Sequence, residues 1–245
     1  MDHMLYTAMS GARQALDQQA VVTHNLANVT TPGFRAQLHA ARAVEVRGDG
    51  LLTRAMTQST TPIADFSPGA ISTSGRELDV AIMGKGWLAV QAQDGSEAYT
   101  RRGDIQVNNE GMLLIAGRPV IGDGGPINVP QGSQVAIGSD GTISVRGQGD
   151  AATNVAAVGR LKLVAAPEPG ILRGGDGLFR TRNNQPLQAD ETIRLASGAL
   201  EGSNVSPTEA MVSLIDNARR YEMHMQSIST AKDDAQRANS ILSLS

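Results

Sequence analysis

The stretch SPTEAMVSLIDNARRYEMHMQSISTAKDDAQRANSILSLS, residues 206–245, decides how this chain folds. Its apolar side chains recur at alternating steps of three and four, at Met211, Leu214, Ala218, Tyr221, Met225, Ile228, Ala235 and Leu242. Ser206, Pro207 and Glu209 form a helix start with a Ser-x-x-Glu capping box. No Gly or Pro follows, so the pattern predicts one helix of roughly 55 Å at about 1.5 Å per residue. A small domain does not cover that length, and we expect the apolar stripe to pack against something else.

A second helical pattern lies at the other end of the chain. Its apolar residues are Leu5, Met9, Ala12, Leu16, Ala20, Val22 and Leu26, and the run stops at Pro32 and Gly33. Two long amphipathic helices at opposite termini predict a paired, coiled-coil-like domain or a seam shared with other subunits. The alternative is two helices packed on an ordinary core, and the length of the C-terminal pattern counts against it.

The middle of the chain has a different composition and period. Between Gly69 and Gly202 lie 23 of the 27 glycines, and apolar residues alternate in short runs. The runs are LDVAIM (78–83), WLAVQA (87–92), DIQV (104–107), MLLI (112–115), QVAI (134–137), TISV (142–145) and RLKLV (160–164). Many short strands separated by Gly-rich turns indicate an all-β domain, and Asp140-Gly141 is the strongest hairpin signal.

The predicted fold is therefore α+β, with long N- and C-terminal helices and a central all-β domain. Residues 1–35 and 205–245 are assigned to a terminal helical assembly domain. Residues 36–73 are assigned to a linker with extended segments, and residues 74–204 to a β-rich outer domain.

Composition argues against several functions. The formal net charge is −3 and no large basic cluster is present, so nucleic-acid binding is not expected. The absence of cysteine excludes disulfides, thiolate catalysis and cysteine-ligated metals. Neither a Sec-type leader nor a run of about 18 apolar residues occurs, so we expect no obvious Sec targeting and no membrane-spanning helix.

Candidate chemical sites are weaker than their structural alternatives. Gly84, Gly86 and Ala89 fit a G-x-G-x-x-A dinucleotide pattern, but a strand follows where that motif needs a helix. The four histidines have no H-x-x-x-H spacing for a metal. The central aspartates mostly adjoin turn residues, although strands can bring two distant carboxylates together as in glycosidases. We expect no catalytic residues, no metal, no cofactor and no small-molecule substrate.

Four motifs in order carry a resemblance to a known family. They are HNLANVTTPGFR (24–35), STSGRELDVAIMGKGW (72–87), YTRRGDIQVNNEGMLL (99–114) and ALEGSNVSPTEAMVSLIDNARRYE (199–222). Together they cover nearly the whole chain, and the chain resembles the bacterial flagellar rod and hook family. The opening MDHMLYTAMSGA (1–12) and the length are most similar to the proximal-rod subtype, with the distal-rod subtype as the alternative.

The resemblance implies an axial structural protein whose terminal helices pair and line a tube. It implies a place in the basal body rod, crossing the periplasm, and export by the flagellar type III apparatus. Implied partners are copies of itself and other rod proteins, and the implied role is torque transmission. The alternative from another class is a periplasmic β-domain enzyme acting on polysaccharide.

The residues expected at the assembly interface come from both termini. From the N-terminal part they are Leu5, Met9, Leu16, Leu26, Asn28, Thr31 and Gly33. From the C-terminal part they are Met211, Leu214, Ile215, Ala218, Tyr221, Met225, Ile228 and Leu242. Asn28, Thr31 and Gly33 are expected to set a turn after the first helix. If Gly33 is left-handed, Asn should replace it better than Val, because Asn tolerates a positive φ.

Overall fold

The computed structural model describes residues 2–45, 55–59, 63–147, 156–166 and 170–242. These residues form two compact units. Unit 1 comprises residues 1–28, 37–65 and 205–245, and unit 2 comprises residues 29–36 and 66–204. The predicted α+β class is confirmed, with one helix near each terminus and a strand-rich region between them.

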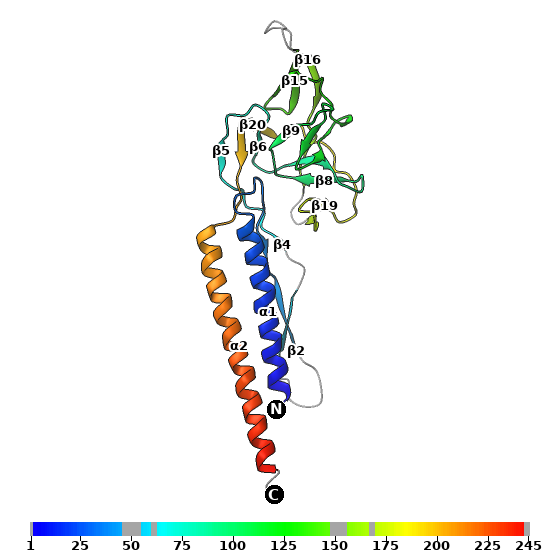
Figure 1. The fold of residues 1–245 in the computed structure, drawn as a ribbon. Coiled ribbons are helices and arrows are strands. Elements are labelled where there is room, and N and C mark those ends of the chain that lie inside the picture. The colour runs from blue at the N-terminus through cyan, green and yellow to red at the C-terminus, as the bar shows by residue number, and fades with distance from the viewer. Residues whose placement is uncertain (1, 46–54, 60–62, 148–155, 167–169, 243–245) are drawn as a thin grey trace. The chain divides into compact units, whose positions relative to one another are not determined.

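Unit 1 is built on two long helices, α1 (Asp2–Ala27) and α2 (Pro207–Leu242). They lie side by side and run in opposite directions (Figure 1). Helix α2 begins as the capping motif predicts, because the Glu209 N–H donates to Ser206 Oγ at 3.4 Å. Its 36 residues correspond to about 54 Å of helix.

The least exposed side of α2 repeats every seven residues. Ala210, Leu214, Asn217, Tyr221, His224, Ile228, Ala231 and Ala235 are buried or half-buried along it. On α1 the buried residues are Ala12 and Ala15. His224 packs against Gly11, where a Cβ would lie 2.4 Å from the imidazole Cε1. Gly11 therefore allows a close approach of the two helices, beside larger half-buried side chains such as Leu214 and Tyr221.

A β-hairpin packs on α1 within the same unit. It consists of β2 (Ala41–Glu45) and β3 (Ala55–Ser59), paired in register from Ala41–Ser59 to Glu45–Ala55. Ser10 Oγ of α1 donates to the Thr57 carbonyl at 3.2 Å and accepts the Thr57 N–H at 3.1 Å. The short strands β1 (Gln37–Leu38) and β4 (Ile63–Ala64) pair beside it, and the Asn25 side chain holds Gln37 through two 2.8 Å hydrogen bonds.

Unit 2 is a set of small antiparallel sheets. The five-stranded sheet has the order β17 (Leu163–Val164), β7 (Trp87–Gln91), β8 (Glu97–Thr100), β19 (Phe179–Thr181), β18 (Ile171–Arg173). Two three-stranded sheets are β11 (Arg118–Pro119), β10 (Leu113–Ile115), β9 (Ile105–Val107) and β14 (Gln134–Ile137), β15 (Thr142–Arg146), β16 (Ala156–Arg160). Strand pairs are β12 (Ile121–Gly122) with β13 (Gly125–Pro126), β6 (Val80–Met83) with β20 (Arg194–Ser197), and β5 (Ile71–Thr73) with β21 (Ala199–Glu201).

Alternating apolar residues from these strands meet in one hydrophobic core. Val80, Leu88, Ile105, Leu113 and Ile143 are at most 1% exposed in it. Trp87 packs edge-on against Phe66 and lies 4.6 Å from Phe179 between ring centroids. This core accounts for the period-two pattern of the sequence.

The predicted β runs are found as strands, with changes at their ends. The Asp140-Gly141 hairpin joins β14 to β15, as expected. The run at 160–164 is split, because Arg160 ends β16 while Leu163 and Val164 form β17. Gly84 has φ +75° between β6 and β7, which is the turn that the G-x-G-x-x-A pattern encodes here instead of a nucleotide loop.

Candidate functional site: a buried ion-pair node and the helix faces

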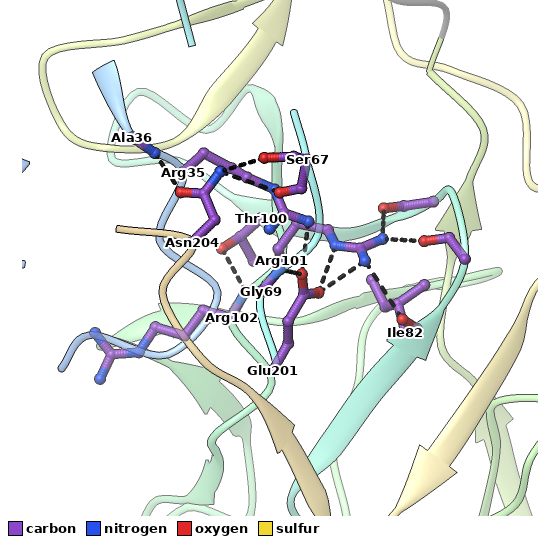
Figure 2. A network of polar contacts seen from close by, with 12 residues as sticks. Arg35, Ala36, Ser67, Gly69, Ile82, Thr100, Arg101, Arg102, Glu201 and Asn204 are labelled. Carbon is purple, nitrogen blue, oxygen red and sulfur yellow. Dashed lines mark hydrogen bonds and ion pairs between the residues drawn. The ribbon is translucent and has the colours of Figure 1, made fainter. Parts of the chain in front are cut away.

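Glu201, at the end of β21, is the centre of a buried polar network in unit 2 (Figure 2). Its side chain is 1% exposed. Oε1 accepts from Arg35 Nη2 at 2.7 Å and from the Gly69 N–H at 2.9 Å. Oε2 accepts from Arg101 Nε at 2.8 Å and Nη2 at 2.7 Å. We call Arg35, Arg101 and Glu201 the ion-pair node.

Arg101 connects the node to the loop between β6 and β7. Its Nη1 donates to the carbonyls of Gly84 at 2.9 Å and Gly86 at 2.7 Å. Its Nη2 also donates to the Ile82 carbonyl at 3.4 Å. The guanidinium is therefore fixed as a planar fork by a carboxylate on one side and backbone oxygens on the other.

Residues 29–36 enter the node from the other side. Gly33 N–H donates to the Glu201 carbonyl at 2.7 Å, and the Phe34 N–H donates to the Thr31 carbonyl at 3.3 Å. Arg173 stacks over Phe34 at 4.5 Å from the ring centroid. Burial lowers the pKa of Arg173. This turn is thus anchored to β21 by backbone and charge contacts and to β18 by the ring contact.

Gly33 meets two requirements at once. Its φ is +65°, which is the left-handed conformation. A Cβ at this position would also lie 2.3 Å from the Arg101 carbonyl carbon. Asn and Val both carry a Cβ, so we expect either one to collide with the backbone at Arg101; the prediction that Asn replaces Gly33 better than Val stays a prediction.

Asn204 fixes the same segment a few residues later. Its Oδ1 accepts the Ala36 N–H at 2.7 Å, and its Nδ2 donates to the Ser67 carbonyl at 3.0 Å and to Ser67 Oγ at 3.2 Å (Figure 2). The Asn204 N–H donates to the Phe34 carbonyl at 3.3 Å. One amide side chain therefore holds three separate stretches of unit 2 together.

The node is suited to holding chain segments together and not to chemistry. All three ionic side chains are at most 3% exposed, and the Glu201 carboxylate is contacted by Arg35, Arg101 and the Gly69 N–H. Removing one partner of such a buried pair typically costs about 3–5 kcal/mol, because the remaining charge has lost its counterion. Arg35, Arg101, Glu201 and Asn204 all lie in the sequence motifs quoted above, but no pattern within a motif predicts that they meet; the one signal for Arg35 and Arg101 is a cation in TTPGFR and in YTRRGD.

Three aspartates of unit 2 stabilise turns. The Thr142 N–H and Oγ1 donate to the Asp140 carboxylate at 3.0 and 2.7 Å, and these bonds lower the pKa of Asp140. The hydrogen bonds from Ser96 and Thr192 likewise lower the pKa values of Asp94 and Asp190. Within residues 2–45, 55–59, 63–147, 156–166 and 170–242, no group of three His, Asp or Glu could hold a metal ion.

Tyr99 is a buried polar residue with a comparable role. Its hydroxyl donates to Glu97 Oε1 at 2.8 Å and accepts the Leu187 N–H at 2.6 Å, and Lys162 Nζ reaches Glu97 Oε2 at 2.8 Å. Burial raises the pKa of Tyr99 well above its ordinary value. The phenol therefore stays neutral and ties the loop after β19 to β8.

The predicted interface residues on the helices fall into two groups. Leu5, Leu26, Leu214, Tyr221 and Ile228 are half-buried. The exposed group comprises Met9 (50%), Leu16 (48%), Met211 (54%), Ile215 (56%), Met225 (44%) and Ala218. The Asn28 side chain donates to the His24 carbonyl at 2.8 Å and so caps the end of α1. The side chain of Leu242 lies outside the described residues.

Comparison with known proteins identifies the family. Three family profiles match in order: "Flagella basal body rod protein" at residues 5–35, "Flagellar hook protein FlgE/F/G D1 domain" at 81–145 and "Flagellar basal body rod FlgEFG protein C-terminal" at 196–241. The flagellar basal-body rod protein FlgF of Salmonella typhimurium is 53% identical over 251 residues, and that of Escherichia coli is 54% identical, each covering 100% of both chains.

The chain belongs to the flagellar basal-body rod protein family. Within this family it is similar to FlgF, whereas FlgG of Buchnera aphidicola (Schizaphis graminum) is 31% identical over 90% of the chain. It is a structural subunit of the proximal rod in the flagellar basal body, and rod proteins are not enzymes. Neither helix, over the residues described, has an apolar stretch that would span a membrane.

Proposed function

We propose that this rod subunit assembles with copies of itself and with other rod proteins through its terminal helices, and that the assembled tube transmits torque. The predicted terminal, linker and outer domains are part of this proposal. The tube would be lined by residues 1–35 and 205–245, and residues 74–204 would lie outside. The observation that carries the proposal is the distribution of apolar side chains on α1 and α2.

Many of the large apolar side chains of the helix pair lie on its exposed surface and not between the helices. The seam between the helices contains Ala12, Ala15, Ala210 and Asn217 as its most buried members. Larger apolar residues are left outside: Tyr6, Met9, Leu16, Met211, Val212, Ile215, Met223 and Met225 are 44–60% exposed. Burying each of them contributes roughly 1.5–3 kcal/mol, so a neighbouring subunit would stabilise this surface substantially.

The seven-residue repeat supports a coiled-coil-like pair within the subunit. Ala210, Asn217, His224 and Ala231 alternate with Leu214, Tyr221, Ile228 and Ala235 on one side of α2. Such a repeat keeps one seam facing a partner helix over many turns. The apolar stripe predicted from the sequence therefore contains two sets of residues. Leu214, Tyr221 and Ile228 lie on the side of α2 that faces α1. Met211, Ala218 and Met225 are exposed and available to a neighbouring subunit.

The ion-pair node supports the mechanical part of the proposal. It connects residues 29–36, which follow α1 in the chain, to Glu201 and Asn204, which precede α2. Both helical connections of the chain therefore start from one buried, hydrogen-bonded site of unit 2. A torque applied to the two connections would therefore be borne by the buried ion pairs and hydrogen bonds of the node.

Incorporation into the basal body tests the proposal. Full-length Leu214→Asp and Ile228→Asp variants should be absent from basal bodies isolated from cells that lack the native copy, because a charge in the seam is costly to desolvate. Arg220→Asp, an exposed position on the same helix, is the control and should be incorporated. Normal amounts of both seam variants in the basal bodies would contradict assembly through the helices.

No observation favours the polysaccharide-enzyme alternative. The turn carboxylates of Asp94, Asp140 and Asp190 accept hydrogen bonds within their own turns, and the buried carboxylates of Glu201 and Asp79 are each 1% exposed. The proposed function also includes secretion by the flagellar type III apparatus, which the family resemblance implies.

A further inference from the structure

Arg35 has hydrogen-bond donors inside the ion-pair node that the protein does not use. Its side chain is 2% exposed, and its Nη2 donates to Glu201 Oε1 at 2.7 Å. Its Nε and Nη1 are shielded from solvent as well, and they have no hydrogen-bond partner among the described residues. These two nitrogens carry most of the N–H groups of a guanidinium. Buried donors are costly to leave unpaired, so an acceptor from outside the chain is expected at this edge of Arg35.

The charge of Arg35 is also only partly compensated. Glu201 Oε2 accepts from Nε and Nη2 of Arg101, whereas Oε1 accepts from Arg35 and from the Gly69 N–H (Figure 2). Arg35 therefore contacts one oxygen of a carboxylate that is shared with a second cation. A cation removed from water needs a close counterion to offset its lost hydration. Glu201 supplies only part of that counterion.

A second guanidinium lies against the same segment. Arg173 stacks over the Phe34 ring at 4.5 Å from its centroid, and its Nη1 donates to the Arg35 carbonyl at 3.4 Å. Arg173 is half-buried, and burial lowers its pKa. Among the residues that the structure describes, no carboxylate forms an ion pair with Arg173. Two side chains therefore bring positive charge to residues 34 and 35, where little water reaches.

The unpaired donors and the surplus charge together specify the kind of ligand. A water molecule accepts hydrogen bonds from buried donors but leaves a charge uncompensated. An anion supplies the acceptor and the countercharge at once. Its size is limited, because Phe34, Arg35 and Glu201 are at most 6% exposed and a phosphate or an organic acid would have to displace them. A monatomic anion of the size of chloride meets these requirements.

We propose that Nε and Nη1 of Arg35 bind a chloride-sized monovalent anion inside unit 2, and that Arg173 adds to the positive potential at this site. The anion completes the hydrogen bonds of Arg35 and offsets the charge that Glu201 leaves. It thereby helps to hold residues 29–36 on unit 2. This inference goes beyond the proposed function, because it concerns the folding of one unit and not the contacts between copies.

Urea unfolding of the full-length chain in two salts of equal ionic strength tests the site. Trp87, which is 3% exposed, reports the unfolding of unit 2 by its fluorescence. Replacing about 0.3 M sodium gluconate by about 0.3 M sodium chloride should lower the unfolding equilibrium constant about tenfold, as expected for a dissociation constant of about 30 mM.

Three arginine variants separate the site from a general effect of the salt. Arg35→Met should abolish the difference between the two salts, and Arg173→Met should reduce it to about threefold or less. Arg182→Met, at an exposed position of the same unit, is the matched control and should keep the tenfold difference. The proposal is overturned if Arg35→Met responds to chloride like the native chain, or if the control loses the response as well.

Anomalous diffraction locates the ion and does not depend on whether Arg35→Met folds. A crystal of the native full-length chain in sodium bromide should show an anomalous peak at hydrogen-bond distance from Arg35 Nε and Nη1. A water molecule at this place without anomalous signal overturns the proposal, and so does a protein acceptor that pairs with both nitrogens. Peaks confined to exposed cations such as Arg182 mean an adventitious ion only, which overturns it too.

Discussion

His224 of α2 lies directly against Gly11 of α1: a Cβ built on Gly11 would be 2.4 Å from Cε1 and 2.8 Å from both ring nitrogens of His224. The helices can approach this closely only because one of them lacks a side chain here. The imidazole is half-buried between them, and the contact defines which turn of α1 faces which turn of α2.

The Gly11–His224 contact predicts a reversal of sign in a double-mutant cycle. Gly→Ala inside an exposed helix normally stabilises by about 1 kcal/mol. Gly11→Ala should instead destabilise unit 1 when His224 is present, because the methyl group displaces the ring. In a His224→Ala background the same substitution should be neutral or stabilising. Thermal unfolding followed by far-UV circular dichroism measures both, and a stabilising Gly11→Ala in the native background would contradict the contact.

The ion-pair node predicts that one substitution that removes a charge with little change of side-chain size strongly destabilises unit 2. Glu201→Gln removes the negative charge between Arg35 and Arg101 and should destabilise unit 2 by about 3–5 kcal/mol. Urea unfolding can be followed by the fluorescence of Trp87, which is the one tryptophan of the chain and is 3% exposed. Glu191→Gln, whose side chain is 81% exposed beside Arg160, is the matched control and should unfold like the native chain.

Two glycines with similar backbone angles distinguish the cost of a positive φ from the cost of a steric clash. Gly33 has φ +65° and no room for a Cβ, whereas Gly75 has φ +77° and nothing within 4 Å of a Cβ. Gly75→Asn should therefore cost little, and Gly33→Asn should destabilise unit 2 by several kcal/mol, as Gly33→Ala should. Urea midpoints of the four chains check this. Equal behaviour of Gly33→Asn and Gly75→Asn would show that the collision at Arg101 is relieved.

Acid should weaken unit 2 through Asp176. The hydrogen bond from Arg180 is the main cause that lowers the pKa of Asp176 below its ordinary value of 3.8, and the Leu178 N–H adds to it. A folded-state pKa below the unfolded one gives stability that is present above the unfolded value and is lost as the pH falls through the folded value. Asp176→Asn should thus be less stable than the native chain at pH 6, and the difference should vanish near pH 2. A stability difference that is the same at pH 6 and pH 2 would contradict this role of the Asp176 carboxylate.

Two adjacent residues of α2 distinguish the inside of the helix pair from its outside. Leu214→Asp should lower the helix content and melting temperature of the purified subunit, because Leu214 lies on the seam. Ile215→Asp should leave both unchanged, since Ile215 is 56% exposed, and yet reduce incorporation into basal bodies by at least about tenfold. Circular dichroism together with quantitative blotting of basal bodies decides between the two sites.

Local patterns were sufficient to predict the α+β class, the start of α2 and the main strands. The capping box at Ser206 and the period-two runs each encode their own structure within a few residues. The strands of residues 36–73 were anticipated only as extended segments, because β2 and β3 owe their position to contacts with α1 such as Ser10–Thr57. No period within the hairpin itself reveals that partner.

The node could not be assembled from sequence alone for a related reason. Arg35, Arg101 and Glu201 each occur in a motif, but their meeting depends on contacts between segments far apart in the sequence, which no pattern within one motif encodes. The helical stripe presented another limit. Apolar residues at steps of three and four lie on one side of a helix, but the pattern does not decide whether the buried row starts at Ala210 or at Met211. Only the position of α1 decides this.

The hydrogen bond between the Ala36 N–H and Asn204 Oδ1 joins positions 168 residues apart. A chain delivered N-terminus first, whether from a ribosome or through a narrow channel, carries residues 29–36 for most of its passage without their counterpart. The last step of folding in unit 2 is then the arrival of β21 and Asn204, and the entropic cost of closing so long a loop falls on that step. Residues 29–36 consequently cannot make these contacts until residues 201–204 have been added to the chain.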